Sequence, residues 1–322
     1  MTLHLLFLNV RTLSLKGDKT KDCPDGDTAA LLQYCTMYSN FPLIAMAETR
    51  LSDSGKRDFG DYTMYRSGGK VGRGLCRRHG VALLIRKDFP HTIHHFEAIS
   101  DRLLLLHGKF KGAPLTVIVA YGPCTTKSPV VTLLRRAEFF TLLQLTINGL
   151  PPALKETLLL VGDFNARVGK ALRSDPQDPY HPYLGAGIEC PDRNAPGTQL
   201  LSICHSEKLA IVNSHFPCGG TWTHARSKGA YKHTIDFIIT NHHHLHQVDD
   251  CGIEPTYDLS DLTDHKALYV HIRLATTTQP YTLHRRNTTR SSDSQPAAKK
   301  KVPLRSIRGR PADAEKIKAA QR

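Results

Sequence analysis

The sequence lacks any apolar run close to the roughly 20 residues that a membrane-spanning helix requires. Its N-terminal apolar stretch, Leu3–Leu8, is short, has no basic segment before it, and is broken by Asn9 and Arg11. These features are not those of a signal peptide, so we interpret the stretch as a buried strand. We therefore expect no membrane partner.

Paired cysteines are also missing. The eight cysteines are scattered from Cys23 to Cys251, and none of them forms a CxxC pair. A chain of this size with dispersed cysteines is typical of reduced thiols in a reducing compartment. On this ground we expect the protein to be intracellular.

Acidic residues are in short supply, because 29 Asp and Glu stand against 43 Lys and Arg, for a net charge of +14. The segment from Ala275 to Arg322 alone carries +9, and it is rich in Thr, Ser and Pro without apolar periodicity. Such a composition predicts disorder. We therefore predict a folded domain over 1–274 and a basic disordered tail over 275–322. The excess charge favours polyanionic partners, nucleic acid before anionic membrane.

Short apolar runs with the length of strands recur along residues 1–274. They are Leu3–Val10, Leu43–Ala47, Val81–Ile85, Arg102–Leu106, Leu115–Tyr121, Thr157–Val161, Ile235–Thr240 and Leu268–Leu274. Two stretches are typical of helices. One begins at Ser128-Pro129, a good cap and first-turn pair, and the other runs from about Gly197 to Lys208. This mixture predicts an α/β domain.

The clearest chemical signal is the string Gly162-Asp163-Phe164-Asn165, which follows the apolar run 158–161. Period-two geometry points Asp163 and Asn165 the same way at a strand end, where rigid backbone can present side chains to a cleft. An acid beside an amide can orient a water and hold a phosphoryl oxygen. A simple turn after the strand is the alternative, since Gly, Asp and Asn are turn formers.

A second signal is the pair Asp264-His265, just before the last predicted strand. Asp236 interrupts the apolar run 235–240, and a buried carboxylate needs a partner. A histidine oriented by a carboxylate is the natural pairing, with His265 as the candidate. The alternatives are a loop for the pair and an edge strand for Asp236.

Three more strand ends carry polar residues, namely Asn9, Glu48 and Tyr121. Hard oxygen ligands such as the Glu48 carboxylate suit Mg²⁺ or Mn²⁺, and a tyrosine hydroxyl can reach a phosphate. Each of these residues alone is weak evidence for a functional site. Together with the signals above they make six polar strand ends in a fixed order, which is a recognisable pattern.

That pattern resembles the endonuclease/exonuclease/phosphatase superfamily over about Leu3 to Leu274, with GDFN and the terminal Asp-His as its most specific elements. The phrases LNVRTL, AETRL, GVALLIRK, GDFNARVG, TWTHARSK and TDHKALYVHIRL resemble the endonuclease domain of non-LTR retrotransposons and the related craniofacial-development-protein-2-like proteins. The resemblance implies a four-layer α/β sandwich of two mixed β-sheets flanked by helices.

The resemblance also implies roles for individual residues. The metal site, for Mg²⁺ or Mn²⁺, would involve Glu48, Asn9 and Asp264. Activation of water and binding of the phosphate would fall to Asp163, Asn165, Tyr121, His265 and its orienting partner Asp236. Fixed donors of this kind supply preorganised electrostatics for phosphodiester hydrolysis.

Two departures from the family pattern carry predictions of their own. Arg11 stands where many relatives have an acid, and we predict that it shares a face with Asn9 and contacts the phosphate of DNA. His233 stands where apurinic endonucleases carry a Trp, so we expect little preference for abasic sites. Trp222, the single tryptophan, is more typical of a core residue than of a base-stacking platform.

The sequence thus predicts a divalent-metal-dependent endonuclease that nicks DNA in the manner of a retrotransposon enzyme. A phosphatase or phosphodiesterase acting on lipid or inositol phosphates is one alternative, and a domain that binds nucleic acid or protein without cutting is another. Lys299, Lys300 and Lys301 in the tail are candidate DNA contacts and favour a nuclear location. The oligomeric state stays open.

Overall fold

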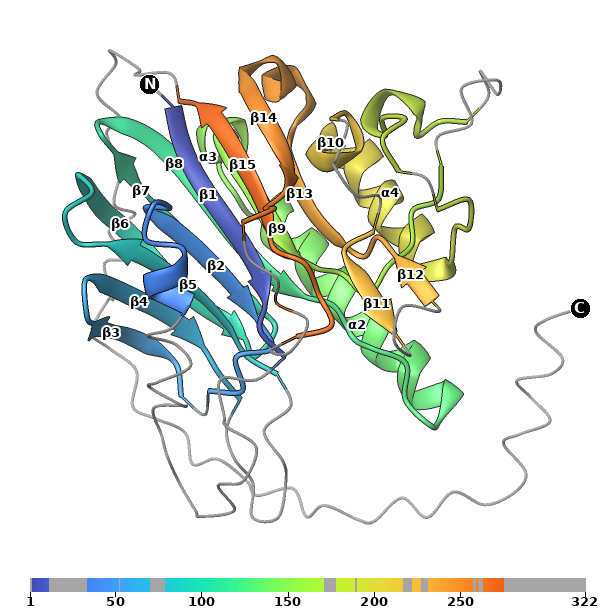
Figure 1. Ribbon diagram of the computed structural model, residues 1–322. Coiled ribbons are helices and arrows are strands. Elements are labelled where there is room, and N and C mark those ends of the chain that lie inside the picture. Colours follow the sequence, from blue (N-terminus) through green and yellow to red (C-terminus); the bar gives the residue numbers. More distant parts are fainter. Residues whose placement is uncertain are drawn as a thin grey trace, which may run out of the picture. The chain divides into compact units, whose positions relative to one another are not determined.

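The computed structural model contains two β-sheets with helices on their outer faces (Figure 1). It describes residues 2–11, 34–51, 53–69, 79–170, 178–188, 190–216, 222–226, 231–256, 259 and 263–274. The predicted tail over 275–322 lies outside these residues, and the domain boundary at 274 stays a prediction.

The first sheet runs in the order β14-β15-β1-β2-β5-β4-β3. Its strands are Val248–Ile253 (β14), Leu268–Arg273 (β15), Thr2–Asn9 (β1), Leu43–Ala47 (β2), Val81–Arg86 (β5), Tyr62–Ser67 (β4) and Gly55–Phe59 (β3). Strands β1 and β2 are parallel, and the other neighbours are antiparallel.

The second sheet repeats this plan in the order β10-β13-β9-β8-β7-β6. Its strands are Leu209–Ile211 (β10), Asp236–Asn241 (β13), Leu158–Asp163 (β9), Ala113–Tyr121 (β8), Leu103–Phe110 (β7) and His91–Ser100 (β6). Here β8 and β9 form the parallel pair. A short hairpin of β11 (His224–Arg226) and β12 (Tyr231–His233) stands apart from both sheets.

The core lies between the two sheets. Alternate residues of each strand point inward, so that β1 contributes Leu3, Leu5 and Phe7, and β8 contributes Val117 and Val119. The opposite faces are also covered, which is why the central strands read as continuous apolar runs. The predicted architecture of two mixed β-sheets flanked by helices is confirmed.

Two helices cover the outer face of the second sheet, as Figure 1 shows. Helix α2 (Pro129–Asn148) begins where the sequence predicted, with the Ser128 side chain accepting a hydrogen bond from the Val131 amide. Helix α4 (Ala195–Glu207) is capped in the same way by Asn194. A five-residue helix, α3 (Pro152–Glu156), leads into β9.

The outer face of the first sheet is covered by residues 34–41, which include a helical turn over 34–37 and the buried side chains of Tyr34 and Tyr38. None of the helices in the described part of the chain is both long and apolar enough to cross a membrane.

Several strands escaped sequence analysis because they are short or polar. Strand β6 carries three histidines and a glutamate, and β14 carries Asp249 and Asp250, so neither shows an apolar run. The histidine-rich segment His242–Gln247 forms a 3₁₀ turn, η3, between β13 and β14. Tertiary pairing, rather than local propensity, selects the strand conformation at such positions.

The two parallel pairs place their carboxyl ends at the same edge of the sandwich, and this edge holds the functional site. Close packing of β8 and β9 depends on Gly162, because a Cβ there would lie 2.1 Å from the carbonyl oxygen of Ala120. The glycine of the GDFN string is therefore a requirement of the sheet rather than of a turn.

Candidate active site

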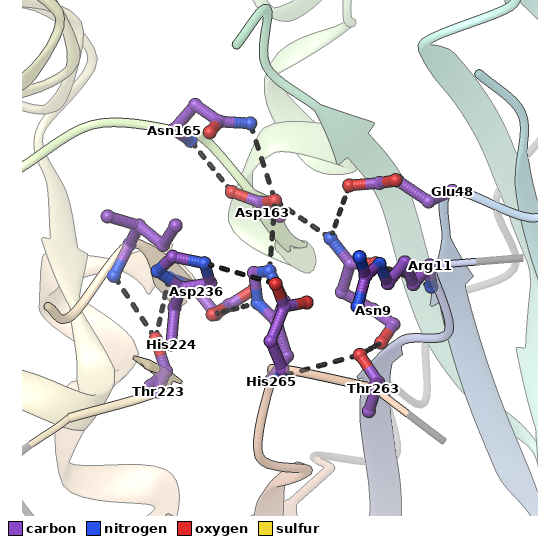
Figure 2. Close-up of polar contacts among 12 residues, drawn as sticks. Asn9, Arg11, Glu48, Asp163, Asn165, Thr223, His224, Asp236, Thr263 and His265 are labelled. Atoms are coloured by element: carbon purple, nitrogen blue, oxygen red, sulfur yellow. Dashed lines mark hydrogen bonds and ion pairs between the residues drawn. The ribbon is translucent and has the colours of Figure 1, made fainter. Parts of the chain in front are cut away.

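Polar side chains from both sheets meet at this edge (Figure 2). Asn9 ends β1 and Glu48 follows β2 in the first sheet, while Asp163 ends β9 and Asn165 follows it in the second. Asp236 opens β13, and His265 precedes β15. Tyr121 ends β8 directly beside Asp163 in the strand register. The structure thus brings together residues up to 256 positions apart in the sequence.

Asn9 connects the two sheets. Its side-chain nitrogen donates to Glu48 Oε1 over 3.1 Å and to Asp163 Oδ2 over 2.9 Å. Its side-chain oxygen accepts from the backbone nitrogen of Arg11 at 2.9 Å. Because one amide serves both carboxylates, it holds two like charges close together that would otherwise separate.

The backbone at this edge is unusual. Glu48, Arg50 and Asn165 have positive φ angles of 55°, 56° and 48°, a conformation that few residues other than glycine adopt. The turn after β2 is fixed by the backbone of residues 79–80, because Thr49 and Arg50 donate to the carbonyls of Gly80 and His79. Backbone strain of this kind is found where a functional geometry is enforced by the surrounding fold.

Arg11 differs from its predicted placement. Strand β1 ends at Asn9, and Arg11 has a φ of 55°, so strand alternation does not extend to it. Its side chain is exposed, and its charge is close enough to contribute to lowering the pKa of Asp264. The argument that period-two geometry sets its side chain on the face of Asn9 therefore fails, while its contact with DNA stays a prediction.

Hydrogen bonds fix both carboxyl oxygens of Asp163. Its Oδ1 accepts from the backbone nitrogen of Asn165 at 2.8 Å, and its Oδ2 accepts from Asn9. The amide of Asn165 donates to the Gly122 carbonyl at 3.0 Å, which ties the segment after β9 to the end of β8. Burial raises the pKa of Asp163, and the carboxylate of Asp236 raises it further.

His265 lies between two buried carboxylates. Its Nδ1 is 2.9 Å from Asp236 Oδ2, and its Nε2 is 3.9 Å from Asp163 Oδ2. Burial disfavours the charged imidazolium, but the charges of Asp236, Asp163 and Asp264 and the hydrogen bond with Asp236 together outweigh it, and the pKa of His265 lies above its ordinary value. Asp236 fixes the ring, so that Nε2 is the nitrogen presented to the site. The pairing of these two residues was predicted from sequence.

Asp264 faces a residue that sequence analysis did not select. His224 Nε2 lies 3.6 Å from Asp264 Oδ2, and the His224 ring lies 4.7 Å from that of His265, centre to centre. The contact with His224 is the largest of the causes that lower the pKa of Asp264 to about 2. His224 belongs to the phrase TWTHARSK, whose only signal was its place in the resemblance.

Two groups in the described part of the chain could hold a metal ion: Glu48 with Asp163 and His265, and His224 with Asp264 and His265. The ligand atoms of each group lie within 4.8 Å of one another. Glu48 belongs to the first group and Asp264 to the second, the two groups share His265, and Asn9 donates a hydrogen bond to Glu48.

A second carboxylate–histidine pair flanks Tyr121. His79 Nδ1 is 2.7 Å from Asp101 Oδ2, and its Nε2 is 2.6 Å from an Arg102 guanidinium nitrogen. Arg102 also donates to the Tyr121 carbonyl at 3.1 Å and lies 4.9 Å from the centre of its ring. Burial raises the pKa of Tyr121, which is therefore a neutral hydrogen-bond donor. Sequence analysis missed this pair.

Comparison with known proteins addresses what such a centre does. The profile of the Endonuclease/Exonuclease/phosphatase family matches residues 8–265, from the end of β1 to the active-site histidine. The chain belongs to this family. Its members hydrolyse phosphoester bonds, so the fold is that of a nuclease or phosphatase, and the resemblance predicted from sequence is confirmed.

Among curated proteins, the chain is similar to Craniofacial development protein 2 of Tragulus javanicus, with 27% identity over 271 residues. The match covers 81% of this chain and 43% of that protein, so the chain spans less than half the length of this relative.

Many solved structures share the fold, and two of them serve as examples. The endonuclease domain of TRAS1, a telomere-specific non-LTR retrotransposon, superposes with a TM-score of 0.52 at 15% identity, covering 85% of this chain and 99% of that domain. The 3′ phosphatase NExo from Neisseria, bound to a product DNA hairpin, gives a TM-score of 0.57 at 18% identity and covers 84% and 99%.

Proposed function

We propose that the protein is a Mg²⁺- or Mn²⁺-dependent endonuclease that nicks DNA. The observation that carries this proposal is the junction of Glu48 and Asp163 through Asn9, directly opposite the His265–Asp236 pair. Two carboxylates and a fixed imidazole around one point are suited to a phosphodiester and a divalent cation. Family membership and the names of the structural neighbours support the same reaction class.

The donor set fits a hard divalent cation. The partly exposed Glu48 and the buried Asp163 supply carboxylate oxygens, and enzymes of this family generally depend on a divalent metal. When bound, such an ion neutralises charge on the phosphate and lowers the pKa of a coordinated water. Glu48 would be its main ligand, with Asn9 holding the carboxylates in place.

The protein's own side chains would activate the water and bind the phosphate. Asp163, with its raised pKa, is suited to orient the attacking water and accept its proton. Asn165, Tyr121 and His265 supply hydrogen-bond donors that are fixed before the substrate arrives. Asp236 keeps the His265 ring in one orientation and stabilises its charged form.

DNA is the substrate that the neighbours favour, since the names of TRAS1 and NExo refer to a retrotransposon endonuclease and to bound DNA. The net charge of +14 supports a polyanionic substrate.

Incubation with supercoiled plasmid, and separately with inositol polyphosphate, distinguishes the candidate activities. We expect nicked plasmid with Mg²⁺ and none with EDTA. Phosphate released from the inositol substrate without nicking would favour the phosphatase alternative, and no reaction in either would favour a binding domain.

The basic tail is a separate proposal, because Lys299, Lys300 and Lys301 lie outside the described residues. We propose that these lysines contact DNA phosphates without reading sequence. Replacing all three by Ala in the full chain should flatten the salt dependence of DNA binding by about 0.9 for each phosphate that is no longer neutralised. An unchanged slope would remove them from the interface. The nuclear location that they suggest stays a prediction.

A further inference from the structure

The single tryptophan of the chain lies between two lysines next to the active site. Lys266 Nζ is 3.7 Å from the centre of the Trp222 ring, and Lys232 Nζ is 5.2 Å from it. Trp222 and Lys266 are half-buried, and Lys232 is exposed. The cluster therefore opens to solvent through Lys232. It corrects our expectation that Trp222 is an ordinary core residue.

Hydrogen bonds fix this cluster to the catalytic residues. The Lys266 backbone nitrogen donates to the Thr223 carbonyl at 2.7 Å, so that the segments carrying Lys266 and Trp222 lie side by side. The Thr223 hydroxyl accepts from the backbone nitrogens of Ile235 and Asp236. Since Lys266 directly follows His265 in the chain, the position of the cluster relative to the active site is set by backbone contacts.

Among the residues that the structure describes, no carboxylate forms an ion pair with Lys232 or Lys266. Arg193 offers a contrast within the same protein, because it stacks on Tyr180 at 5.2 Å but is paired with Asp178 at 3.2 Å.

We propose that Trp222, Lys232 and Lys266 form a binding site for a non-scissile phosphate of the DNA strand, beside the phosphate that is cut. This inference rests on the proposed function. Two cations held against one aromatic ring present a compact positive charge, and a phosphodiester is the anion that a DNA strand brings to this place. The site would position the strand rather than read its sequence.

Because Trp222 is the single tryptophan, its fluorescence reports on this site alone. The full chain is titrated with a DNA duplex in EDTA, so that binding is read without cleavage. We expect a saturable change in emission, with log Kd against log salt giving a slope that falls by about 0.9 in Lys266→Ala. Lys232→Ala should act in the same direction, and since Lys232 is exposed this variant should fold normally. Lys266→Arg should keep the slope.

Lys111 is the matched control, because it also lies over an aromatic ring, that of Phe89 at 5.1 Å, but in the turn at the amino-terminal end of β8. Lys111→Ala should bind DNA as the native chain does. Inorganic phosphate should give no saturable change, which separates a strand site from a site for the free ion. The proposal is overturned if DNA leaves the emission of Trp222 unchanged, or if the slopes of both lysine variants equal that of Lys111→Ala. Failure to nick plasmid would leave this binding result intact.

Discussion

The protein contains two pairs of histidine and aspartate that look alike and differ in surroundings. His265 and Asp236 are almost fully buried, with side-chain exposures of 6% and 0%. His79 and Asp101 are exposed to 24% and 35%. In each pair the histidine Nδ1 atom contacts the carboxylate, and the two pairs differ in the group that the Nε2 atom contacts. For His265 it is the Asp163 carboxylate, and for His79 it is the Arg102 guanidinium.

On the proposed function, this difference distinguishes a reactive group from a structural one. The Nε2 atom of His79 accepts a hydrogen bond from Arg102, so its lone pair is engaged. His265 has carboxylates on both sides, which favour the imidazolium and leave Nε2 as a donor toward the site. A carboxylate–histidine pair is therefore no sign of catalysis by itself, and the third partner decides its role.

The comparison is tested most strongly by removing the two imidazoles in turn, beginning with the buried one. His265→Ala should lower the nicking rate by about 10²-fold or more, the scale of losing one positioned catalytic group. The measurement is the rate of plasmid nicking at saturating Mg²⁺, with folding checked by circular dichroism. A loss of less than about threefold in a folded variant would place His265 outside the mechanism.

Removing the carboxylate behind the imidazole should have a smaller effect. Asp236→Asn keeps the shape of the side chain but withdraws the charge that favours the imidazolium of His265. Groups that orient a functional residue typically contribute about 10- to 100-fold. The rate profile of the variant should also lose its activity at a lower pH than the native profile, since the pKa of His265 falls. An unshifted profile would mean that Asp236 is only a packing residue.

Changing the half-exposed pair of His79 and Asp101 should lower the nicking rate less than either change to the buried pair. His79→Ala frees Arg102, but the guanidinium keeps its hydrogen bond to the Tyr121 carbonyl. We expect a fall in nicking rate of less than about tenfold, carried by looser placement of Tyr121. His79→Gln, which preserves an acceptor for Arg102, should recover most of the rate. A loss as large as that of His265→Ala would abolish the distinction between the two pairs.

The buried centre should also affect stability in a pH-dependent way. Because burial raises the pKa of Asp163 above the roughly 3.9 of an unfolded chain, the folded state holds a proton that the unfolded state has released. The stability of the metal-free protein should therefore fall as pH rises from about 4. Asp163→Asn carries no such charge, so in EDTA at pH 8 it should melt a few degrees above the native protein, with a smaller gap at pH 5.

Asp192→Asn is the control for this measurement, since Asp192 is exposed and pairs loosely with Arg167 at 3.7 Å. Its melting temperature should equal that of the native chain at both pH values. A lower melting temperature for Asp163→Asn at pH 8 would show that the hydrogen bonds of the carboxylate outweigh its burial.

The residues of this site that could be predicted from the sequence are those at the ends of strands. Asp163, Glu48 and Asn9 each end an apolar run, and the pairing of Asp236 with His265 follows from the need of a buried carboxylate for a partner. What the sequence could not supply was the conformation after the strands end. The left-handed φ of Arg11 takes it out of the strand pattern, because alternation holds only while the strand continues.

Contacts made only in three dimensions were also beyond sequence reasoning. His79 and Asp101 are 22 residues apart in segments without a recognisable motif. His79 precedes β5 of the first sheet and Asp101 lies between β6 and β7 of the second, so the packing of the two sheets brings them together. Trp222 could not be distinguished from a core residue by its neighbours in the chain. The two lysines that contact its ring come from β12 and from the segment before β15. Local sequence propensity cannot predict contacts between such distant segments.

One measurement tests the central claim that the edge formed by Asn9, Glu48, Asp163 and His265 is a metal-dependent phosphodiesterase centre. Supercoiled plasmid is incubated with the native chain and with Asp163→Ala over a range of Mg²⁺ concentrations, with Asp192→Asn as the control. The native and control chains should convert plasmid to the nicked form only when Mg²⁺ is present, and Asp163→Ala should be slower by about 10²-fold or more at every concentration. Equal nicking by Asp163→Ala, or nicking that persists in EDTA, would contradict the account.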